Sequence, residues 1–278
     1  MTGAADHGPF GRKCFDGGMA GSEEFDVRPV RAFRPGPGVQ VDDAVWPASV
    51  PAMAQLLREG LELPPGLTVL VGENGSGKST VMESLAEAYG LNPQGGSVQG
   101  RLFQVRDSEP GVGGELTVVR GLRAPWSYFL RADTMSQLYT YLEQNPGRRT
   151  ERLHELSHGE GFLEILRTRV NQEGFYLMDE PDAPLSFVAS LGLAALLHDL
   201  AAAGSQVVVA THSPIVAAVP GANLLELGPW GIRPATWEDL SLVVAWRQFM
   251  RDPRSFFRHL FQACDLASAG RCFHGRSA

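Results

Sequence analysis

Short apolar runs recur along the chain, and most of them end in glycine or in polar residues. Four such runs, at 67–72, 175–180, 206–211 and 223–228, are typical of strands buried on both faces. Segments with helical periodicity lie between them. This alternation predicts an α/β fold, in which helices flank a mostly parallel sheet.

The clearest helix signals stand between these runs. A helix is expected over Lys78–Tyr89, where "GLNPQGGS" ends it, and another over 157–170. A long alanine- and leucine-rich helix should join the runs at 175–180 and 206–211. The second of these helices should pack inward through Phe162, Leu163, Ile165 and Leu166.

Other segments predict further elements around this core. Residues 25–33 form a candidate strand in which Pro29 would suit a sheet edge. A short helix should follow within 50–63, with Val50, Met53, Leu56 and Leu57 on one side. Residues 95–125 alternate polar and apolar positions, which predicts an antiparallel β layer. Residues 131–145 and 236–262 should be helical.

The resulting organisation is one domain after a short tail. Residues 1–24 are rich in glycine, aspartate and alanine and are expected to be disordered. The domain should span 25–278, with a small helical subdomain at about 125–170 and C-terminal helices at about 236–265.

Composition narrows the classes of function. The net charge of −7 and pI of about 5.5 argue against a mainly electrostatic grip on nucleic acid. Three scattered cysteines do not form a disulfide framework or paired zinc ligands, and no signal pattern opens the chain. No apolar stretch is long enough to span a membrane. A cytoplasmic protein is expected.

One glycine-rich stretch carries a specific chemical signal. "GENGSGKS", from Gly72 to Ser79, fits the pattern G-x-x-x-x-G-K-[ST] after an apolar strand and before a helix. Its backbone N–H groups should bind phosphate, Lys78 should reach the β- and γ-phosphates of ATP, and Ser79 should ligate Mg²⁺. A turn that binds nothing would have no use for either side chain. The predicted cofactor-binding residues here are Gly72, Glu73, Asn74, Gly75, Ser76, Gly77, Lys78, Ser79 and Thr80.

Two adjacent carboxylates end the second apolar run. Asp179 stands where a second strand would hold hydrated Mg²⁺, and Glu180 where a base would activate the attacking water. Alone, this pair would also fit a solvated acidic turn. Because parallel strands present their carboxyl ends at one edge, the segments "GENGSGKST", "DEPD" and "THS" should meet in space.

Four motifs in order resemble those of the ABC-type ATPase superfamily. The phosphate loop is followed by "LSHGE" from Leu156 to Glu160, by the Asp179–Glu180 pair and by His212 within "THS". The resemblance covers roughly 60–228. It extends, on less specific features such as "FLRAD" and "FMRDPRSFF", to small stand-alone bacterial ATPases related to DNA-repair and defence ATPases.

The resemblance implies roles for further residues. Ser157 and Gly159 would contact the γ-phosphate of ATP bound to a second subunit, and His212 that of its own subunit. ATP would then be buried in a head-to-tail homodimer. The segment Pro181–Ser186 matches a loop that crosses between subunits, although "PDAPLS" departs from the usual sequence and Asp182 would have to substitute. Taken alone, "LSHGE" is also a helix cap and His212 also an ordinary strand-end histidine.

A glutamine that couples transporter ATPases to their membrane partner is missing in plain form. Gln137 falls inside a predicted helix, and Gln104 comes early. Arg131 and Asp133, at the end of "SYFL", are better placed. A charged substitute is therefore expected.

Three functions remain in view. The first is an ATP-hydrolysing switch whose dimer acts on nucleic acid or a protein, favoured by Glu160 and by the missing glutamine. The second is the ATP-binding subunit of an ABC transporter, which would have a membrane partner. The third is an ATP-binding scaffold with little turnover, against which the intact Lys78, Asp179 and Glu180 argue. Only about 75 residues separate the phosphate loop from "LSHGE", which leaves no room for a long coiled coil.

The sequence defines two possible contact surfaces less clearly. Candidates for contact with the adenine are Arg31, Phe33 and Arg34. The C-terminal aromatic residues are read as core rather than as a binding face. Four arginines could fall near one side of a helix, although Pro253 interrupts it and a solvated face is preferred: Arg247, Arg251, Arg254 and Arg258.

Overall fold

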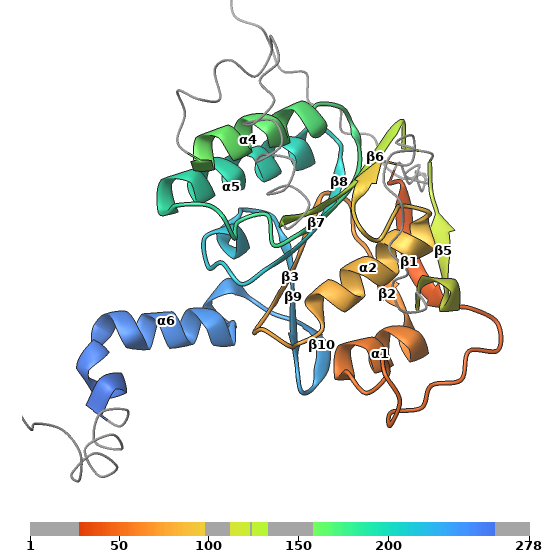
Figure 1. The fold of residues 1–278 in the computed structure, drawn as a ribbon, viewed down its shortest axis with the longest axis horizontal. Coiled ribbons are helices and arrows are strands. Elements are labelled where there is room, and N and C mark those ends of the chain that lie inside the picture. Colours follow the sequence, from red (N-terminus) through yellow and green to blue (C-terminus); the bar gives the residue numbers. More distant parts are fainter. Residues whose placement is uncertain (1–27, 98–111, 123, 133–157, 259–278) are drawn as a thin grey trace, which may run out of the picture.

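The computed structural model describes residues 28–97, 112–122, 124–132 and 158–258 (Figure 1). A sheet of seven strands lies at its centre, in the order β10-β9-β3-β8-β7-β6-β4. Five neighbouring strands are parallel, and one antiparallel strand lies at each edge. The strands are β3 (Leu67–Gly72), β4 (Gly96–Ser97), β6 (Trp126–Arg131), β7 (Gly174–Asp179), β8 (Gln206–Thr211), β9 (Asn223–Gly228) and β10 (Gly231–Pro234).

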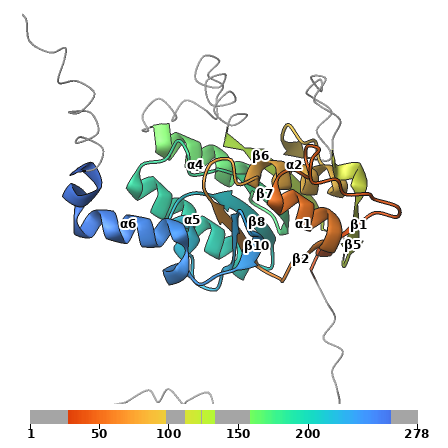
Figure 2. The same ribbon diagram turned by 90° about the horizontal axis from the view of Figure 1, so that it is seen from below.

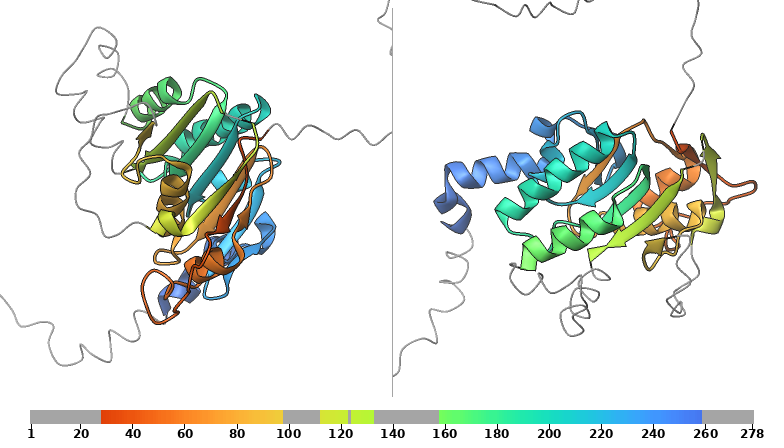
Figure 3. Two further views of the ribbon diagram at one scale, coloured as in Figure 1. Left: turned by 90° about the vertical axis from the view of Figure 1, so that its right-hand side faces the viewer. Right: turned by 90° about the horizontal axis from the view of Figure 1, so that it is seen from above.

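Helices cover both faces of this sheet, as Figure 3 shows. The helices α1 (Pro51–Glu59) and α2 (Lys78–Tyr89) share one buried core with one face of the sheet. The helices α4 (His158–Arg169) and α5 (Phe187–Ala202) share a second core with the other face. The α/β fold predicted from the alternating apolar runs is therefore confirmed.

Alternate residues of the central strands divide between the two cores. Leu70 of β3 and Val208 of β8 belong to the core beneath α2. Val69 and Val209, their neighbours in the chain, belong to the core beneath α5. Because successive side chains of a strand point to opposite faces, a strand that is covered twice has to be apolar throughout.

A second, antiparallel sheet packs beside α1 and α2, in the order β2-β1-β5. It consists of β1 (Val30–Pro35), β2 (Leu61–Glu62) and β5 (Leu116–Arg120). The buried amide of Gln206, at the start of β8, ties it to the main sheet. Its oxygen accepts from Val30 N at 2.9 Å, and its nitrogen donates to Val30 O at 2.8 Å.

This arrangement corrects two expectations. Pro29 was expected to mark an edge strand, but it lies just before β1, which is the central strand of the small sheet. The N–H that proline lacks is therefore not needed in the ladder. The antiparallel layer predicted over 95–125 is present as β5, whereas β4 joins the edge of the main sheet instead.

The C-terminal part of the described chain extends away from the body (Figures 1 and 2). The helix α6 (Ser241–Arg251) follows a turn of 3-10 helix at Trp237–Asp239, and further short turns of 3-10 helix lie at Val112–Glu115 and Val216–Ala218. The aromatic side chains of this part were read as core. Trp246, Phe256 and Phe257 are instead 40–50% exposed, because within the described residues no element covers α6 on its outer side. The four arginines are exposed, as expected.

Among the described residues, none of the helices combines the length and the apolar composition that crossing a membrane requires. The helix predicted over 131–145 falls mostly outside the described residues.

Candidate functional site

The loop between β3 and α2 has the conformation that its glycines allow. Gly75 and Gly77 have φ angles of 82° and 93°, in the region that favours glycine. A Cβ at Gly77 would also lie 2.5 Å from Cγ1 of Val50. The loop therefore turns tightly into the N-terminus of α2, where backbone N–H groups are available to an anion.

Lys78 lies at the centre of this loop. Its ammonium group donates hydrogen bonds to the carbonyl oxygens of Gly72 at 2.9 Å and Glu73 at 3.1 Å. It also lies 3.8 Å from Oε1 of Glu180. Burial lowers the pKa of Lys78, and the carboxylates of Glu180, Asp179 and Asp182 oppose this shift. The cation is thus enclosed in a ring of acids and carbonyls.

Ser79 and Asp179 bring two oxygen groups together. The Ser79 hydroxyl donates to Oδ1 of Asp179 at 3.3 Å. Burial raises the pKa of Asp179 to about 6, against the opposing effects of the Ser79 hydrogen bond and the Arg131 charge. A hydroxyl and a carboxylate are hard oxygen ligands of the kind Mg²⁺ prefers, so this pair fits a magnesium ion. The hydroxyl of Ser76, in the same loop, is buried without a hydrogen-bond partner among the described residues.

Glu180 follows β7 in an unusual backbone conformation. Its φ of 50° is the only positive value among the described residues other than glycine. Its N–H donates to the carbonyl oxygen of Ala210 in β8 at 2.9 Å. The conformation directs the carboxylate towards Nδ1 of His212, at 3.5 Å, as well as towards Lys78. A non-glycine residue held in this region is under local strain.

The loop after Glu180 is tied to the end of β8. Thr211 donates a 2.6 Å hydrogen bond to Oδ1 of Asp182, and both residues are buried. Burial raises the pKa of Asp182, and the Thr211 bond opposes that shift. The carboxylate of Asp182 is therefore engaged inside its own chain, and a role of this loop towards a second subunit stays a prediction.

Segments that follow three strand ends line one cavity of about 1190 Å³. Gly72 to Ser76 form one side of it, and Asp182 and His212 another. Exposed apolar side chains of α5 and α6 also line it: Phe187, Trp246 and Met250. The three strand ends therefore meet at one cavity, as the sequence predicts.

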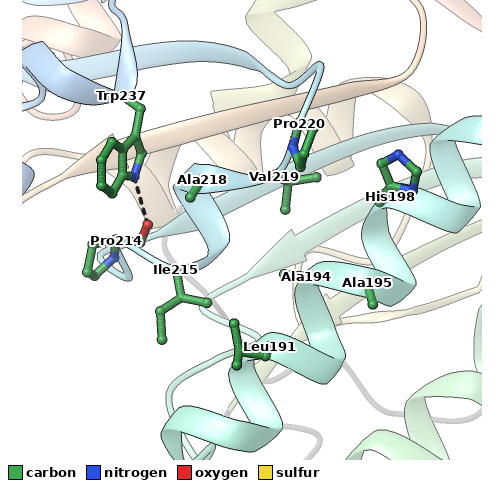
Figure 4. Close-up of a pocket in the computed structure, with 10 residues that line it drawn as sticks. All are labelled: Leu191, Ala194, Ala195, His198, Pro214, Ile215, Ala218, Val219, Pro220 and Trp237. Atoms are coloured by element: carbon green, nitrogen blue, oxygen red, sulfur yellow. Dashed lines mark hydrogen bonds between the residues drawn. The ribbon is translucent and has the colours of Figure 1, made fainter.

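A second hollow, of about 610 Å³, contains none of the predicted site residues (Figure 4). Leu191, Ala194 and Ala195 of α5 face Ile215 and Trp237 across it, and the indole of Trp237 donates to Pro214 O at 2.9 Å. His198 is the one ionisable side chain in its lining. Gly72 to Ser76 and His212 line the first cavity and not this one.

Gly159 lies in the first turn of α4. A Cβ at this position would lie 3.2 Å from Ala189 and 3.8 Å from Leu185, at the start of α5. Ser157 is outside the described residues. The contact of both residues with nucleotide in a second subunit stays a prediction.

Arg131 ends β6, next to the strand of Asp179. Its guanidinium pairs with Oε1 of Glu83 at 2.5 Å and donates to Pro93 O at 3.1 Å. A charged residue does occupy this strand end. Gln104, Gln137 and Asp133 lie outside the described residues.

Burial reduces the number of residues that could contact the adenine of ATP. Phe33 is fully buried in the core under α1 and cannot stack on a base, which corrects that expectation. Arg34 is exposed and forms an ion pair with Glu62. Arg31 is exposed as well.

Two acids in the site region were missed by the sequence reasoning. Glu83 stands four residues after Ser79 in α2, a spacing that places both on one helix face and could have indicated it. Glu226 is an acid inside an apolar strand, which signals a buried partner. Its carboxylate accepts from Arg233 at 2.6 Å and from Ser241 N, at the start of α6, at 2.7 Å.

Comparisons with known proteins bear on this site. Residues 60–183 match the family model "ABC transporter". A comparison with curated protein sequences finds no match.

Two solved structures share weak similarity with the chain. One is the SMC head domain from Thermotoga maritima, with 16% identity, coverage of 63% of this chain and 92% of that chain, and a TM-score of 0.40. The other is described as a metal-chelate type ABC transporter in an inward-facing conformation, with 18% identity, coverage of 66% and 76%, and a TM-score of 0.39. Both TM-scores lie below 0.5, so neither neighbour supports a statement about function.

The matched region contains the phosphate loop, Lys78 and Ser79 at one end and the Asp179–Glu180 pair at the other. The geometry brings Ser79 to Asp179 and Lys78 to Glu180, and the loop residues Gly72 to Ser76 line the cavity. Residues 60–183, which hold these groups, are therefore similar to the ABC transporter family.

Proposed function

We propose that the chain is a Mg²⁺-dependent ATPase that works at the ends of β3, β7 and β8. One observation carries this proposal. Lys78 and His212 both approach the same carboxylate oxygen of Glu180, at 3.8 Å and 3.5 Å, beside a phosphate loop that opens into a large cavity. A cation, a base and an imidazole at one point are the groups that phosphoryl transfer to water requires.

The phosphates would be bound by the loop and by the N-terminus of α2. Lys78, which now donates to two loop carbonyls, would exchange these for phosphate oxygens. Ser79 and Asp179 would hold Mg²⁺. When bound, this ion neutralises part of the phosphate charge.

Hydrolysis would use Glu180 as the base. As the oxygen of a water molecule attacks the γ-phosphorus, Glu180 accepts its proton and the bond to the β–γ bridging oxygen breaks, so that ADP and phosphate are the products. His212 would donate a hydrogen bond to the γ-phosphate. Its side chain is 44% exposed, so it can turn towards a bound nucleotide.

We further propose that ATP joins two copies head to tail. In that arrangement Ser157 and Gly159 of one copy would contact the γ-phosphate held by the other. The atoms nearest to a Cβ at Gly159 belong to Ala189, Leu185 and Ser186 and not to the phosphate loop, which leaves this residue available to another subunit. The dimer would act on nucleic acid or on a protein partner.

A second candidate is the ATP-binding subunit of an ABC transporter. The match of residues 60–183 to the family model "ABC transporter" favours it. Glu160, in place of the glutamine that transporter ATPases usually carry, favours the first candidate.

The test is steady-state ATP turnover, with and without double-stranded DNA, and with Glu180→Gln as the blank. Turnover that requires Glu180 and Mg²⁺ is the expected result, and Lys78→Ala should bind ATP poorly. Wild-type turnover in Glu180→Gln would disprove the base assignment. Stimulation by DNA would support a nucleic-acid partner, whereas indifference to DNA would direct the search to a protein or membrane partner.

Association is tested separately by gel filtration with and without ATP. Glu180→Gln should accumulate as a dimer when ATP and Mg²⁺ are present, because it binds ATP and hydrolyses it slowly. A monomer under these conditions would contradict the ATP-joined dimer without affecting the hydrolytic site.

A further inference from the structure

Arg131 and Asp179 end two neighbouring strands at the same level. The parallel strands β6 and β7 pair in a register that sets Arg131 opposite Asp179. Side chains in register on adjacent parallel strands point to the same face of a sheet. Both side chains therefore approach the face that α2 covers.

The helix α2 meets these two side chains with two of its own. Ser79 and Glu83 lie four residues apart, on one face of the helix. The Ser79 hydroxyl donates to Asp179 at 3.3 Å, and Glu83 pairs with Arg131 at 2.5 Å. Two parallel links thus join one face of α2 to two adjacent strand ends.

The two links differ in chemistry. Ser79 and Asp179 are the oxygen pair assigned to Mg²⁺, and they are held by a single long hydrogen bond. The Arg131–Glu83 link is a short ion pair whose arginine side chain is only 18% exposed, and Arg131 also donates to Pro93 O, beyond the end of α2. A guanidinium has a planar set of donors that can hold a carboxylate and a carbonyl together, which makes it a firm connection.

The positive charge of Arg131 also offsets the negative charges around it. Asp179, Glu180 and Glu83 are three carboxylates around the start of α2, and Lys78 is the cation inside the loop. Arg131 adds a second cation, in register with Asp179 on the adjacent strand. It can remain there when nucleotide binds, since it touches none of the loop residues that line the cavity among the described contacts.

We propose that Arg131 is a positioning residue for the nucleotide site. Through Glu83 it fixes the face of α2 that presents Ser79, and it thereby sets the separation between the Ser79 hydroxyl and the Asp179 carboxylate. This inference rests on the proposed function, because it takes that pair as the magnesium ligands.

The experiment measures the Mg²⁺ concentration that gives half-maximal thermal stabilisation of the protein by a non-hydrolysable ATP analogue. The variants are Arg131→Gln, Arg131→Lys and Glu83→Gln. Binding of the same analogue in the presence of EDTA is measured alongside, so that a loss of metal affinity is separated from a loss of nucleotide affinity.

Arg120→Gln is the matched control. Arg120 also connects a strand to α2, since it donates to Tyr89 O at 2.8 Å and lies 4.5 Å from the centre of the Tyr89 ring. This link is at the far end of the helix from Ser79. A general loosening of α2 would affect the control as much as the test variants.

Arg131→Gln and Glu83→Gln should each raise the required Mg²⁺ concentration about tenfold, the size of effect that groups behind a metal ligand have. The double variant should equal either single variant, because both remove one link. Arg131→Lys should fall in between, and Arg120→Gln should match the wild type. Analogue binding in EDTA should be unchanged throughout.

An unchanged Mg²⁺ requirement in both Arg131→Gln and Glu83→Gln would overturn the inference and leave the proposed function intact. An equal rise of the required Mg²⁺ concentration in Arg120→Gln would also overturn the inference, because it would show a general effect on α2. If Mg²⁺ fails to improve analogue binding by the wild type, the proposed metal site fails, and that result is visible without any variant. Should Arg131→Gln fail to fold, Glu83→Gln and Arg131→Lys decide the question.

Discussion

Thr211 donates a 2.6 Å hydrogen bond to Asp182, which joins the last residue of β8 to the loop after β7. The same hydroxyl accepts from the N–H of Ser213 at 2.9 Å. His212 lies between these two anchored positions. The Thr211 hydroxyl thus anchors the backbone on both sides of His212, whose imidazole lies 3.5 Å from Glu180.

Thr211→Val tests this arrangement. The variant keeps the shape of the side chain but leaves the buried Asp182 carboxylate without its donor, which should cost about 1–3 kcal/mol of unfolding free energy. The cost should be larger at about pH 8 than at about pH 5, because burial already raises the pKa of Asp182 and the hydrogen bond favours its charged form. Urea denaturation at the two pH values measures both effects.

Thr236→Val is the control for this variant. Thr236 donates a hydrogen bond of the same length, 2.6 Å, to Asp239, but that bond is exposed. Its loss should change stability by less than about 0.5 kcal/mol. Equal costs for the two variants would contradict the importance of burial at Thr211.

Asp179→Asn should stabilise the nucleotide-free protein at neutral pH. Burial raises the pKa of Asp179 from 3.8 to about 6, so the folded state favours the protonated carboxyl. The stability that this group contributes is complete below about pH 4 and is lost as the pH rises through about 6. Asparagine resembles the protonated form, so the gain near pH 7.5 should reach up to about 3 kcal/mol.

The measurement is chemical denaturation of wild type and Asp179→Asn across this pH range, without nucleotide or Mg²⁺. The difference between the two proteins should vanish at about pH 4. The variant should also lose the effect of Mg²⁺ on nucleotide binding. A wild type that is the more stable protein at neutral pH would refute the prediction.

The backbone conformation at Glu180 predicts that a glycine variant is more stable than an alanine variant, which reverses the usual order of stability. At a φ of 50°, Glu180→Gly should be about 1 kcal/mol more stable than Glu180→Ala, because only the alanine has a Cβ that clashes in this region. Both variants lack the carboxylate, so activity does not enter the comparison. The same two substitutions at Glu164, inside α4, should give the opposite order.

Glu226→Gln should weaken the attachment of α6. Burial alone would raise the pKa of Glu226, but hydrogen bonds from Ser241 and Arg233 outweigh it, and the pKa lies below 4.5. The stability from this group is therefore present above about pH 4.5 and is lost as the pH falls through the lower folded value. The variant should lose about 2 kcal/mol at neutral pH and less in acid, as measured by thermal unfolding. Glu238→Gln, an exposed acid in the turn before α6, should lose little.

Local signals in the sequence are sufficient to predict the helices and strands of the core. The helix Lys78–Tyr89 begins and ends as predicted because Gly77 and Gly90, both at positive φ, mark its two ends. The strand Leu67–Gly72 is also as predicted, since an apolar run between loop signals has few alternatives. The meeting of the phosphate loop with Glu180 and His212 follows from the rule on strand ends.

Contacts between segments far apart in the sequence could not be predicted from such local signals. Phe33 was open to a role with adenine because nothing in its neighbourhood shows that α1 folds over it. Trp246 was read as core because an aromatic residue in a helix gives no sign of whether a second element covers it. The partnership of Glu83 with Arg131 depends on the order of strands in the sheet, which periodicity does not determine.

The position of β8 between β3 and β7 fixes the distance between the strand of the phosphate loop and the strand of the base. Adjacent strands lie about 4.8 Å apart, so the strand of the phosphate loop and the strand of the base stand about 10 Å from each other. That width leaves room above the end of β8 for a phosphate group and a water molecule. Because it is determined by backbone hydrogen bonds, substitutions in the loops can change which groups act there without changing the space in which they act.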